Sequence, residues 1–277
     1  MLKQTSKVLA AILYTIRPSA TLGACLLAVS AFNPQTKEWQ EVIWLVVCAF
    51  TGSSFCFILN DIFDKEKDLL NNKKRPIATG ELPLPIALIA TIVFGVIFMA
   101  SAAAFGKVVL ILSVLFLGLA TSYSFLNRVS GFPANVMVAV FVAGTQWGVY
   151  WIKADSILYF SSLFLFFISI PREMLLDWLD IEGDRASGKS SLAWTTSRKR
   201  FNQILGLMIV GASSSIFLLL YMEPLPMHSI VLFITSTLLF GISFIRFFRN
   251  ASRKNVLHGV RFSHLSYAIF MVAMLTR

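Results

Sequence analysis

Long apolar stretches alternate with shorter polar connections along most of this 277-residue chain. Each stretch has about 17–24 residues, which is long enough for a helix to cross a lipid bilayer. A helix satisfies its own backbone hydrogen bonds in hydrocarbon, and the stretches lack the alternation of a β-barrel. The pattern predicts an all-α, polytopic membrane bundle of about nine transmembrane helices around a central apolar cavity. The expected spans are residues 9–31, 41–60, 84–104, 108–126, 134–152, 156–176, 203–221, 227–247 and 259–275.

The connections between these spans differ in length. Two are long and polar, over residues 61–83 and 177–202, whereas the others are short. The first span is interrupted by Arg17 and Pro18. We expect one integral membrane domain over residues 1–277.

Composition supports the membrane class and excludes a soluble globule. Hydrophobic residues make up 57% of the chain, charged residues 14%, and the mean hydropathy is +0.75. Soluble domains carry about 25% charged residues. The net charge of +10 comes from basic residues beside the spans, so it is explained by membrane topology and does not predict nucleic-acid binding.

Basic residues are divided unevenly between the two sides of the predicted bundle. Twenty of the 24 lysines and arginines fall on the side of the N-terminus and the two long connections. The other side has Lys37, Lys107, Lys153 and Arg277. Because connections rich in Lys and Arg stay in the cytoplasm, we expect the N-terminus and both long connections to be cytoplasmic and the C-terminus to lie outside.

Two aspartate triplets are the main candidates for chemistry. Six of the seven aspartates form two groups with the spacing i, i+3, i+7, each beginning where an apolar span ends on the cytoplasmic side. On a helix this spacing places three carboxylates on one face. The first triplet is Asp61, Asp64 and Asp68, and the second is Asp177, Asp180 and Asp184.

Two interpretations of the triplets compete. Either they are solvated helix ends paired with nearby lysines, or they bind a cation that relieves the repulsion between neighbouring carboxylates. The second copy of the pattern favours the cation, since charged groups at membrane depth mark function. Mg²⁺ takes carboxylates, waters and substrate phosphates as ligands, so two facing triplets would hold Mg²⁺ ions that bind a diphosphate.

Polar and basic residues around the triplets fit a diphosphate. Asn60 offers a neutral oxygen ligand, Lys67 and Arg75 follow the first triplet, and Arg185 and Lys189 follow the second. Arginine presents a planar fork to phosphate and lysine a compact charge. Anchoring at the membrane surface is the alternative for these cations. Arg17, within the first span, either needs a buried partner or extends its charge to the membrane surface.

These residues resemble the UbiA superfamily of intramembrane prenyltransferases. Residues 60–68 read NDIFDKEKD, which matches the family's NDxxDxxxD, and continue through Asn72 and RPIATG at residues 75–80. Residues 177–185 read DWLDIEGDR, which matches the second signature. Arg17–Pro18 and Tyr123–Ser124 also fall where the family has them, and the resemblance covers essentially the whole chain.

The resemblance implies a role for each matched position. The six aspartates of the triplets would be Mg²⁺ ligands, and Tyr123 and Arg75 would act in catalysis. The residues implied to bind the diphosphate are Asn60, Lys67, Asn72, Arg75, Arg128, Arg185, Lys189 and Arg17. Arg172–Glu173 and the run Gly131–Asn135 are similar to the geranylgeranylglyceryl phosphate synthase and lycopene elongase branches. Leu176 and Leu179 stand where those relatives often carry Lys and Glu, which leaves the acceptor open.

The implied activity is Mg²⁺-dependent transfer of a prenyl group from an allylic diphosphate to a lipophilic acceptor, such as a quinone precursor or glycerophospholipid. Mg²⁺ and basic residues would neutralise the leaving diphosphate. A terpene cyclase of the same superfamily, which needs no acceptor, is the alternative. A channel or Mg²⁺ transporter would need polar groups through the bilayer midplane, and the spans carry almost none.

Overall fold

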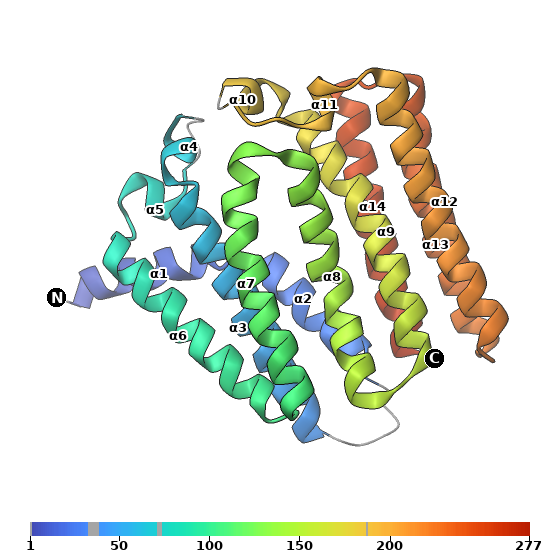
Figure 1. Ribbon diagram of the computed structural model, residues 1–277, viewed down its shortest axis with the longest axis horizontal. Coiled ribbons are helices and arrows are strands. Elements are labelled where there is room, and N and C mark those ends of the chain that lie inside the picture. Colours follow the sequence, from blue (N-terminus) through green and yellow to red (C-terminus); the bar gives the residue numbers. More distant parts are fainter. Residues whose placement is uncertain (1, 33–38, 71–73, 187) are drawn as a thin grey trace. The chain divides into compact units, whose positions relative to one another are not determined.

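The protein is mostly helical in the described part of the chain, which covers residues 2–32, 39–70, 74–186 and 188–277 of a computed structural model (Figure 1). Fourteen helices follow one another in this part. They are α1 (Leu2–Thr15), α2 (Pro18–Ser30), α3 (Trp39–Phe63), α4 (Lys65–Leu70), α5 (Pro76–Thr79), α6 (Leu84–Ala103), α7 (Lys107–Val129), α8 (Gly131–Lys153), α9 (Ser156–Leu179), α10 (Ile181–Ala186), α11 (Leu192–Thr195), α12 (Arg198–Met222), α13 (Met227–Arg249) and α14 (Arg253–Leu275).

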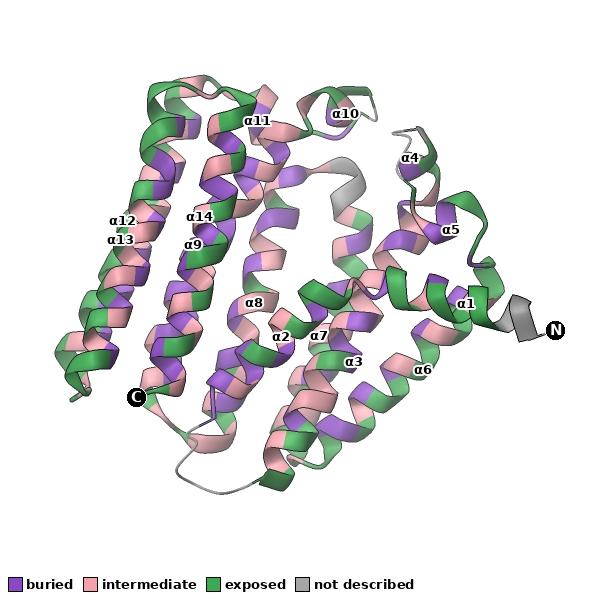
Figure 2. Ribbon diagram, turned by 180° about the vertical axis from the view of Figure 1, so that it is seen from behind, coloured by how far each residue is buried: buried purple, intermediate pink, exposed green. Residues whose placement is uncertain are grey.

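Eight of these helices are long and apolar enough to cross a membrane, and a ninth span results if the bent pair of α1 and α2 counts as one. These numbers hold for the described residues. Exposed and buried positions alternate along each long helix (Figure 2). On α6 the exposed side chains include Ile89, Ile92 and Val96, which is the apolar surface expected against lipid. The prediction of an all-α membrane bundle is confirmed.

Most of the long helices extend beyond the apolar stretches that predicted them, although α6 does not. The span expected at 203–221 begins at Arg198, and the span expected at 259–275 begins at Arg253. Ser197 explains the first of these starts, because its hydroxyl accepts a hydrogen bond from the amide of Arg200. The two long polar connections also contain short helices, α4, α5, α10 and α11.

Arg17 separates α1 from α2. Its φ of 51° lies in the left-handed region, which non-glycine residues rarely adopt. Pro18 then begins α2, since its fixed φ suits the first helical position. The axes of the two helices meet at 55°, so the first expected span is broken at the residues that interrupt its apolar sequence.

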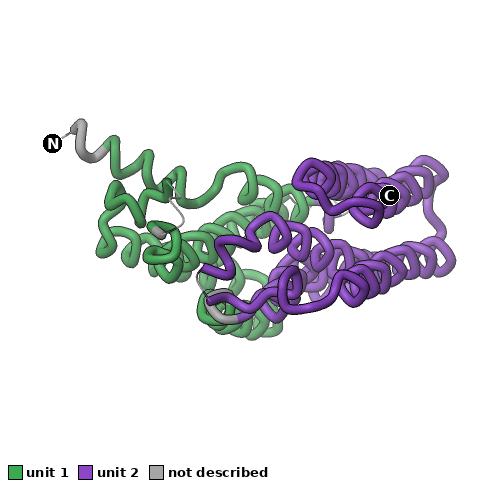
Figure 3. The backbone as a smooth tube through the Cα atoms, turned by 90° about the horizontal axis from the view of Figure 1, so that it is seen from above, with its two compact units in different colours: residues 1–29, 37–128 green, residues 30–36, 129–277 purple. Residues whose placement is uncertain are grey.

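The chain forms two compact units (Figure 3). The first comprises residues 1–29 and 37–128, and the second comprises residues 30–36 and 129–277. The expectation of one domain over residues 1–277 stays a prediction.

In the first unit, α3 packs along α6, and α1 contacts α3 and α5. Gly52 of α3 permits the close approach to α6, because a Cβ at this position would lie 2.9 Å from the ring of Phe98. An apolar cluster joins α1, α3 and the α5–α6 segment. Its buried members are Ala11, Ile16, Ile58, Ile77, Leu82 and Ala87.

In the second unit, α9 is the central helix and contacts α8, α12 and α14, while α13 packs against α14 (Figure 1). Phe164 of α9 stacks on Phe270 of α14 with ring centroids 5.0 Å apart. Gly211 of α12 allows the approach to α9, because a Cβ there would lie 2.7 Å from the ring of Phe167. Pro171 lies inside α9, which membrane helices tolerate when neighbouring groups bind the freed carbonyl.

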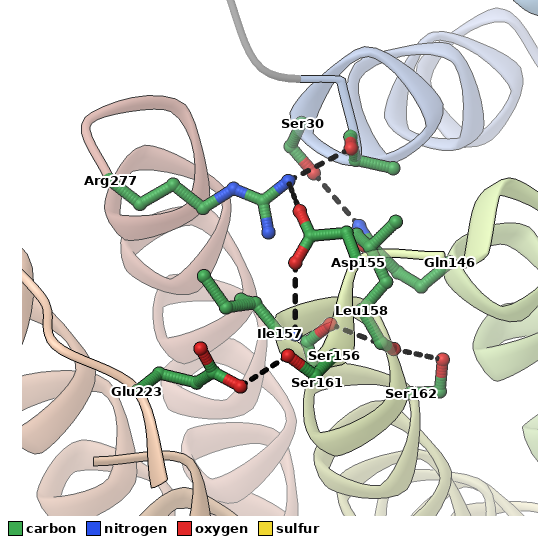
Figure 4. Close-up of polar contacts among 11 residues, drawn as sticks. Ser30, Gln146, Asp155, Ser156, Ile157, Leu158, Ser161, Ser162, Glu223 and Arg277 are labelled. Atoms are coloured by element: carbon green, nitrogen blue, oxygen red, sulfur yellow. Dashed lines mark hydrogen bonds and ion pairs between the residues drawn. The ribbon is translucent and has the colours of Figure 1, made fainter. Parts of the chain in front are cut away.

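A polar cluster in the second unit lies at the α8–α9 connection, at the opposite end of α9 from the aspartates (Figure 4). Arg277 pairs with Asp155 at 3.0 Å and donates to the carbonyl of Ala31 at 3.0 Å. Ser156 donates to Glu223, and Gln146 donates to the Ser30 hydroxyl at 3.1 Å. The cluster therefore joins segments that are far apart in the sequence.

The same succession of helices occurs once in each unit. In the first unit, a long helix (α3) is followed by a six-residue helix, a four-residue helix and another long helix. In the second unit, α9, α10, α11 and α12 repeat this order and these short lengths. Each aspartate triplet lies at the junction of the first two helices of its series.

Candidate active site

The first triplet spans the junction of α3 and α4. Asp61 lies in the last turn of α3, Asp64 lies between the two helices, and Asp68 lies in α4. The amide of Asp64 bonds the Asn60 carbonyl and the amide of Asp68 bonds the Asp64 carbonyl, both at 2.8 Å. These i to i−4 bonds continue the helical path, which keeps the three carboxylates near one face. All three residues are buried.

The second triplet has the same local structure at the junction of α9 and α10. Asp177 lies in the last turn of α9, Asp180 ends that helix, and Asp184 lies in α10. The amide of Asp184 bonds the Asp180 carbonyl at 2.8 Å, as in the first triplet. Asp177 and Asp184 are buried, whereas Asp180 is exposed.

Arg17 forms an ion pair with the first triplet, so this arginine within the first expected span has a buried partner. Its guanidinium donates to Oδ1 of Asp61 at 2.6 Å and lies over the ring of Phe57, 4.9 Å from the centroid. Asn60 donates from Nδ2 to Oδ2 of Asp64 at 3.1 Å. Arg75 is a second cation whose charge reaches Asp61. Arg17 and Asn60 therefore contact carboxylates of the first triplet, and their role in binding a diphosphate stays a prediction.

Lys189 is the cation that pairs with the second triplet, as Arg17 pairs with the first. Its ammonium lies 3.1 Å from Oδ1 of Asp177 and 3.6 Å from Oδ2 of Asp184. Burial lowers the pKa of Lys189, but the two carboxylates outweigh burial, and the net pKa lies above the ordinary value. Lys189 is thus charged at neutral pH and neutralises two buried aspartates.

The oxygen atoms present suit a hard divalent cation such as Mg²⁺. Oδ2 of Asp61 and Oδ1 of Asn60 are buried and accept no hydrogen bond, and a buried acceptor left in this way is costly unless a cation or water binds it. Among the described residues, no three His, Cys, Asp or Glu side chains converge closely enough to form a metal site by themselves. Mg²⁺ usually takes one or two carboxylates together with waters and phosphates, so these oxygens fit it.

The remaining predicted site residues belong to α4, α7 and α10 or fall outside the described residues. Lys67 lies in α4, and Arg185 of α10 lies over the ring of Trp194, 5.5 Å from its centroid. Tyr123 is in α7, whose end approaches α3 through a 5.9 Å contact between Phe63 and Phe125. Asn72 and the side chain of Arg128 lie outside the described residues.

Asn135 was missed as a site residue. It lies in α8 and donates from Nδ2 to Oδ2 of Asp177 at 2.7 Å. The amide of Gly131, at the start of α8, also donates to the Ser190 carbonyl at 2.6 Å. The signal was an amide side chain at the start of a mainly apolar stretch that also contains Gln146, and nothing in the sequence alone assigns Asn135 a partner.

A protein-family model, the UbiA prenyltransferase family, matches residues 20–267. The chain belongs to this family. Curated relatives in the UbiA family include the digeranylgeranylglyceryl phosphate synthase of Pyrococcus abyssi, which is 28% identical over 180 residues. This match covers 64% of each chain, so the matched part is less than two thirds of that relative. The synthase of Saccharolobus solfataricus is 25% identical over 219 residues, with 76% of this chain and 75% of the relative covered.

Solved structures of UbiA-family proteins share the fold. A structure of digeranylgeranylglyceryl phosphate synthase superimposes with a TM-score of 0.81 and 18% identity, covering 96% of this chain and 97% of that one. A UbiA homologue from Archaeoglobus fulgidus bound to GPP and Mg²⁺ gives a TM-score of 0.71 and 18% identity, covering 95% and 99%. At this identity the likeness establishes the fold.

Proposed function

We propose that this protein transfers a prenyl group from an allylic prenyl diphosphate to a lipophilic acceptor within the membrane. The observation that carries the proposal is the pair of aspartate triplets, in which every residue except Asp180 is buried. Each triplet contacts a cationic side chain of its own unit. Membership of the UbiA family and the GPP- and Mg²⁺-bound homologue support it. Neighbouring carboxylates repel one another, and burying them with a cation inside a membrane protein lowers stability. Their presence therefore favours a functional role.

The carboxylates of both triplets, together with Asn60, would hold Mg²⁺. Bound Mg²⁺ would supply charge neutralisation for the diphosphate as it leaves. Arg17, Arg75 and Lys189 would donate to the diphosphate oxygens, and Lys67, Arg185 and the undescribed Asn72 and Arg128 are proposed as further contacts. The ring of Tyr123 would stabilise the allylic cation by a cation–π interaction. The surrounding apolar helices would keep water from quenching that cation.

We also propose that the N-terminus and the two triplets lie on the cytoplasmic side. Support comes from the distribution of basic residues, of which Lys199, Arg200 and Arg253 begin helices on the same side as the triplets in the predicted topology. Cysteine labelling from outside the cell tests the assignment. A cysteine introduced at exposed Glu182 is expected to resist labelling, and one introduced at Glu223 is expected to react.

The experiment that tests the activity uses the purified protein in lipid nanodiscs with geranylgeranyl diphosphate. We expect Mg²⁺-dependent release of diphosphate, and Asp64→Ala and Asp184→Ala each abolish it. Glu81→Gln, an exposed carboxylate between α5 and α6, is the matched control and should retain release. Mass spectrometry of the prenyl chain distinguishes transfer to an acceptor from a free cyclic hydrocarbon, which would identify a cyclase. Release that is unaffected by either aspartate variant would refute the proposed site.

A further inference from the structure

A small cavity lies beside the end of α9 that carries the second triplet. Its volume is about 110 Å³, and it is lined by Trp178, Leu179, Ala251 of the α13–α14 connection and Arg253 at the start of α14. Consecutive residues of a helix point about 100° apart, so Trp178 faces away from its neighbour Asp177. The cavity is therefore separate from the carboxylates proposed to bind Mg²⁺.

Trp178 and Arg198 connect four helix ends around this cavity. The indole of Trp178 donates from Nε1 to the carbonyl of Ala251 at 3.3 Å. The guanidinium of Arg198, at the start of α12, donates to the carbonyl of Phe247 at 2.5 Å and lies 4.8 Å from the centroid of the Trp178 ring. These contacts join the ends of α9 and α13 to the starts of α12 and α14, at the top of the view in Figure 1.

These helix ends are strongly basic and have no acidic residue among them. The sequence over residues 192–277 contains one acidic residue, Glu223, which follows the opposite end of α12. Nη1 of Arg198 is buried and makes no hydrogen bond, which is costly for a donor. Seven basic residues lie in the terminal turns at the cavity end, and these are Arg198, Lys199, Arg200, Arg246, Arg249, Arg253 and Lys254.

We propose that the cavity binds the phosphate group of an anionic phospholipid. Arg253 and the first amide groups of α14 donate to the phosphate, since arginine and the start of a helix both bind phosphate oxygens. Leu257 and Leu265, farther along α14, are exposed and offer an apolar surface to the acyl chains. The surrounding positive charge disfavours a headgroup that also carries a cation.

A bound lipid also restrains the second triplet. Trp178 and Leu179 line the cavity and lie between Asp177 and Asp180 in the sequence. A headgroup held against these two residues and Arg253 ties the end of α9 to the start of α14. The backbone that carries the second triplet therefore becomes less mobile when the lipid is bound.

The first test measures lipid binding by native mass spectrometry of the purified protein. The probes are phosphatidylglycerol, phosphatidylcholine with the same acyl chains, and inorganic phosphate as a competitor. We expect a single phosphatidylglycerol to bind in preference to phosphatidylcholine, and inorganic phosphate not to displace it. Arg253→Gln should weaken this binding by about tenfold, as for loss of a charge-assisted contact. Lys107→Gln is the control, because Lys107 is also an exposed cation that begins a long helix, and it should bind as wild type.

A second variant tests the cavity without a change of charge. Ala251→Leu adds a larger side chain to the cavity wall and should weaken phosphatidylglycerol binding while the protein stays folded, as judged by its helical circular dichroism. Hydrogen exchange in nanodiscs tests the restraint of α9. In the wild type, amides of residues 176–182 should exchange more slowly in phosphatidylglycerol than in phosphatidylcholine, and Arg253→Gln should remove the difference.

The possible results separate a specific site from general attraction to charge. Equal losses of affinity in Arg253→Gln and Lys107→Gln, full binding by Ala251→Leu, or equal affinities for the two lipids would each overturn the site. Displacement by inorganic phosphate would identify a soluble anion as the ligand and overturn the lipid. Exchange that does not depend on the lipid would overturn the restraint of α9. No prenyl donor is present in these measurements, so they succeed or fail independently of the proposed transferase function.

Discussion

Gly131 lies against the carboxylate of Asp177, so closely that a Cβ on this glycine would be 3.0 Å from Oδ2 of the aspartate and 2.9 Å from Cβ of Ser191. The missing side chain lets the start of α8 approach both the second triplet and the segment after α10. The hydrogen bond from Gly131 to Ser190 depends on the same approach. A residue without a functional group therefore sets the position of a carboxylate proposed to bind Mg²⁺.

Gly131→Ala should push α8 away from Asp177. We expect the free energy of unfolding to fall by about 1–3 kcal/mol, the usual cost of overpacking, and Mg²⁺-dependent binding of the prenyl diphosphate to weaken. Denaturant unfolding and donor titration measure these effects. Gly144→Ala in the same helix is the control, because nothing lies within 4 Å of its added Cβ. Equal behaviour of the two variants would contradict the role of Gly131.

Lys189→Met should leave the carboxylates of Asp177 and Asp184 without their common cation. Removal of one member of a buried ion pair costs about 3–5 kcal/mol, so the unfolding temperature should fall. Mg²⁺ should raise that temperature more in the variant than in the wild type, since it replaces the lost positive charge. The exposed Lys199→Met is the control, with an expected change within about 0.5 kcal/mol. A variant with no enhanced response to Mg²⁺ would argue against metal binding at this triplet.

The backbone of Arg17 stores strain that substitution can reveal. Both Arg17→Gly and Arg17→Ala lose the ion pair to Asp61, but only alanine keeps the cost of a left-handed conformation. We expect the glycine variant to be more stable than the alanine variant by about 1–2 kcal/mol. Within helix α2 glycine should instead be less stable than alanine, so Ala20→Gly should lower the free energy of unfolding by about 1 kcal/mol. If the glycine variant is no more stable than the alanine variant, residue 17 does not have the left-handed conformation between α1 and α2.

Arg277→Ala should destabilise the polar cluster around Asp155 without affecting the active site. The arginine side chain is 3% exposed, and its loss removes the ion pair to Asp155 and the bond to Ala31. We expect the free energy of unfolding, measured with denaturant, to fall by about 1–3 kcal/mol. The KM for the donor should stay unchanged. Arg261→Ala, an exposed position on α14, is the control. A raised KM for the donor would show that the two ends of the bundle are coupled.

The sequence predicted the spans well because they depend on local pattern, and the triplets are a local pattern of the same kind. Apolar length determines which segments cross the membrane, and the i, i+3, i+7 spacing determines which aspartates share a face. Helix ends were less predictable: Arg198 and Arg253 are charged yet begin helices, since a helix continues past the hydrocarbon as long as its backbone bonds are satisfied. The break at Arg17 followed the sequence, because Pro18 restarts the helix there.

The sequence alone did not predict which side chains contact one another. Asn135 meets Asp177 across 42 residues, and Arg17 meets Asp61 across 44. Contacts of this kind depend on which helices pack together, and the apolar pattern does not encode that choice. The roles of Tyr123, Arg75 and the other predicted site residues stay predictions, to be tested by the variants described above.

The contact between Ala31 and Arg277 has a consequence for biosynthesis. Residues 30–36 belong to the second compact unit, although the segments before and after them belong to the first. Ala31 receives its hydrogen bond from a residue 246 positions later, so this segment emerges from the ribosome long before its partner exists. The carbonyl of Ala31 therefore lacks this bond until the last helix has been inserted, and a chaperone or insertase that shields the end of α2 in this interval would raise the yield of folded protein.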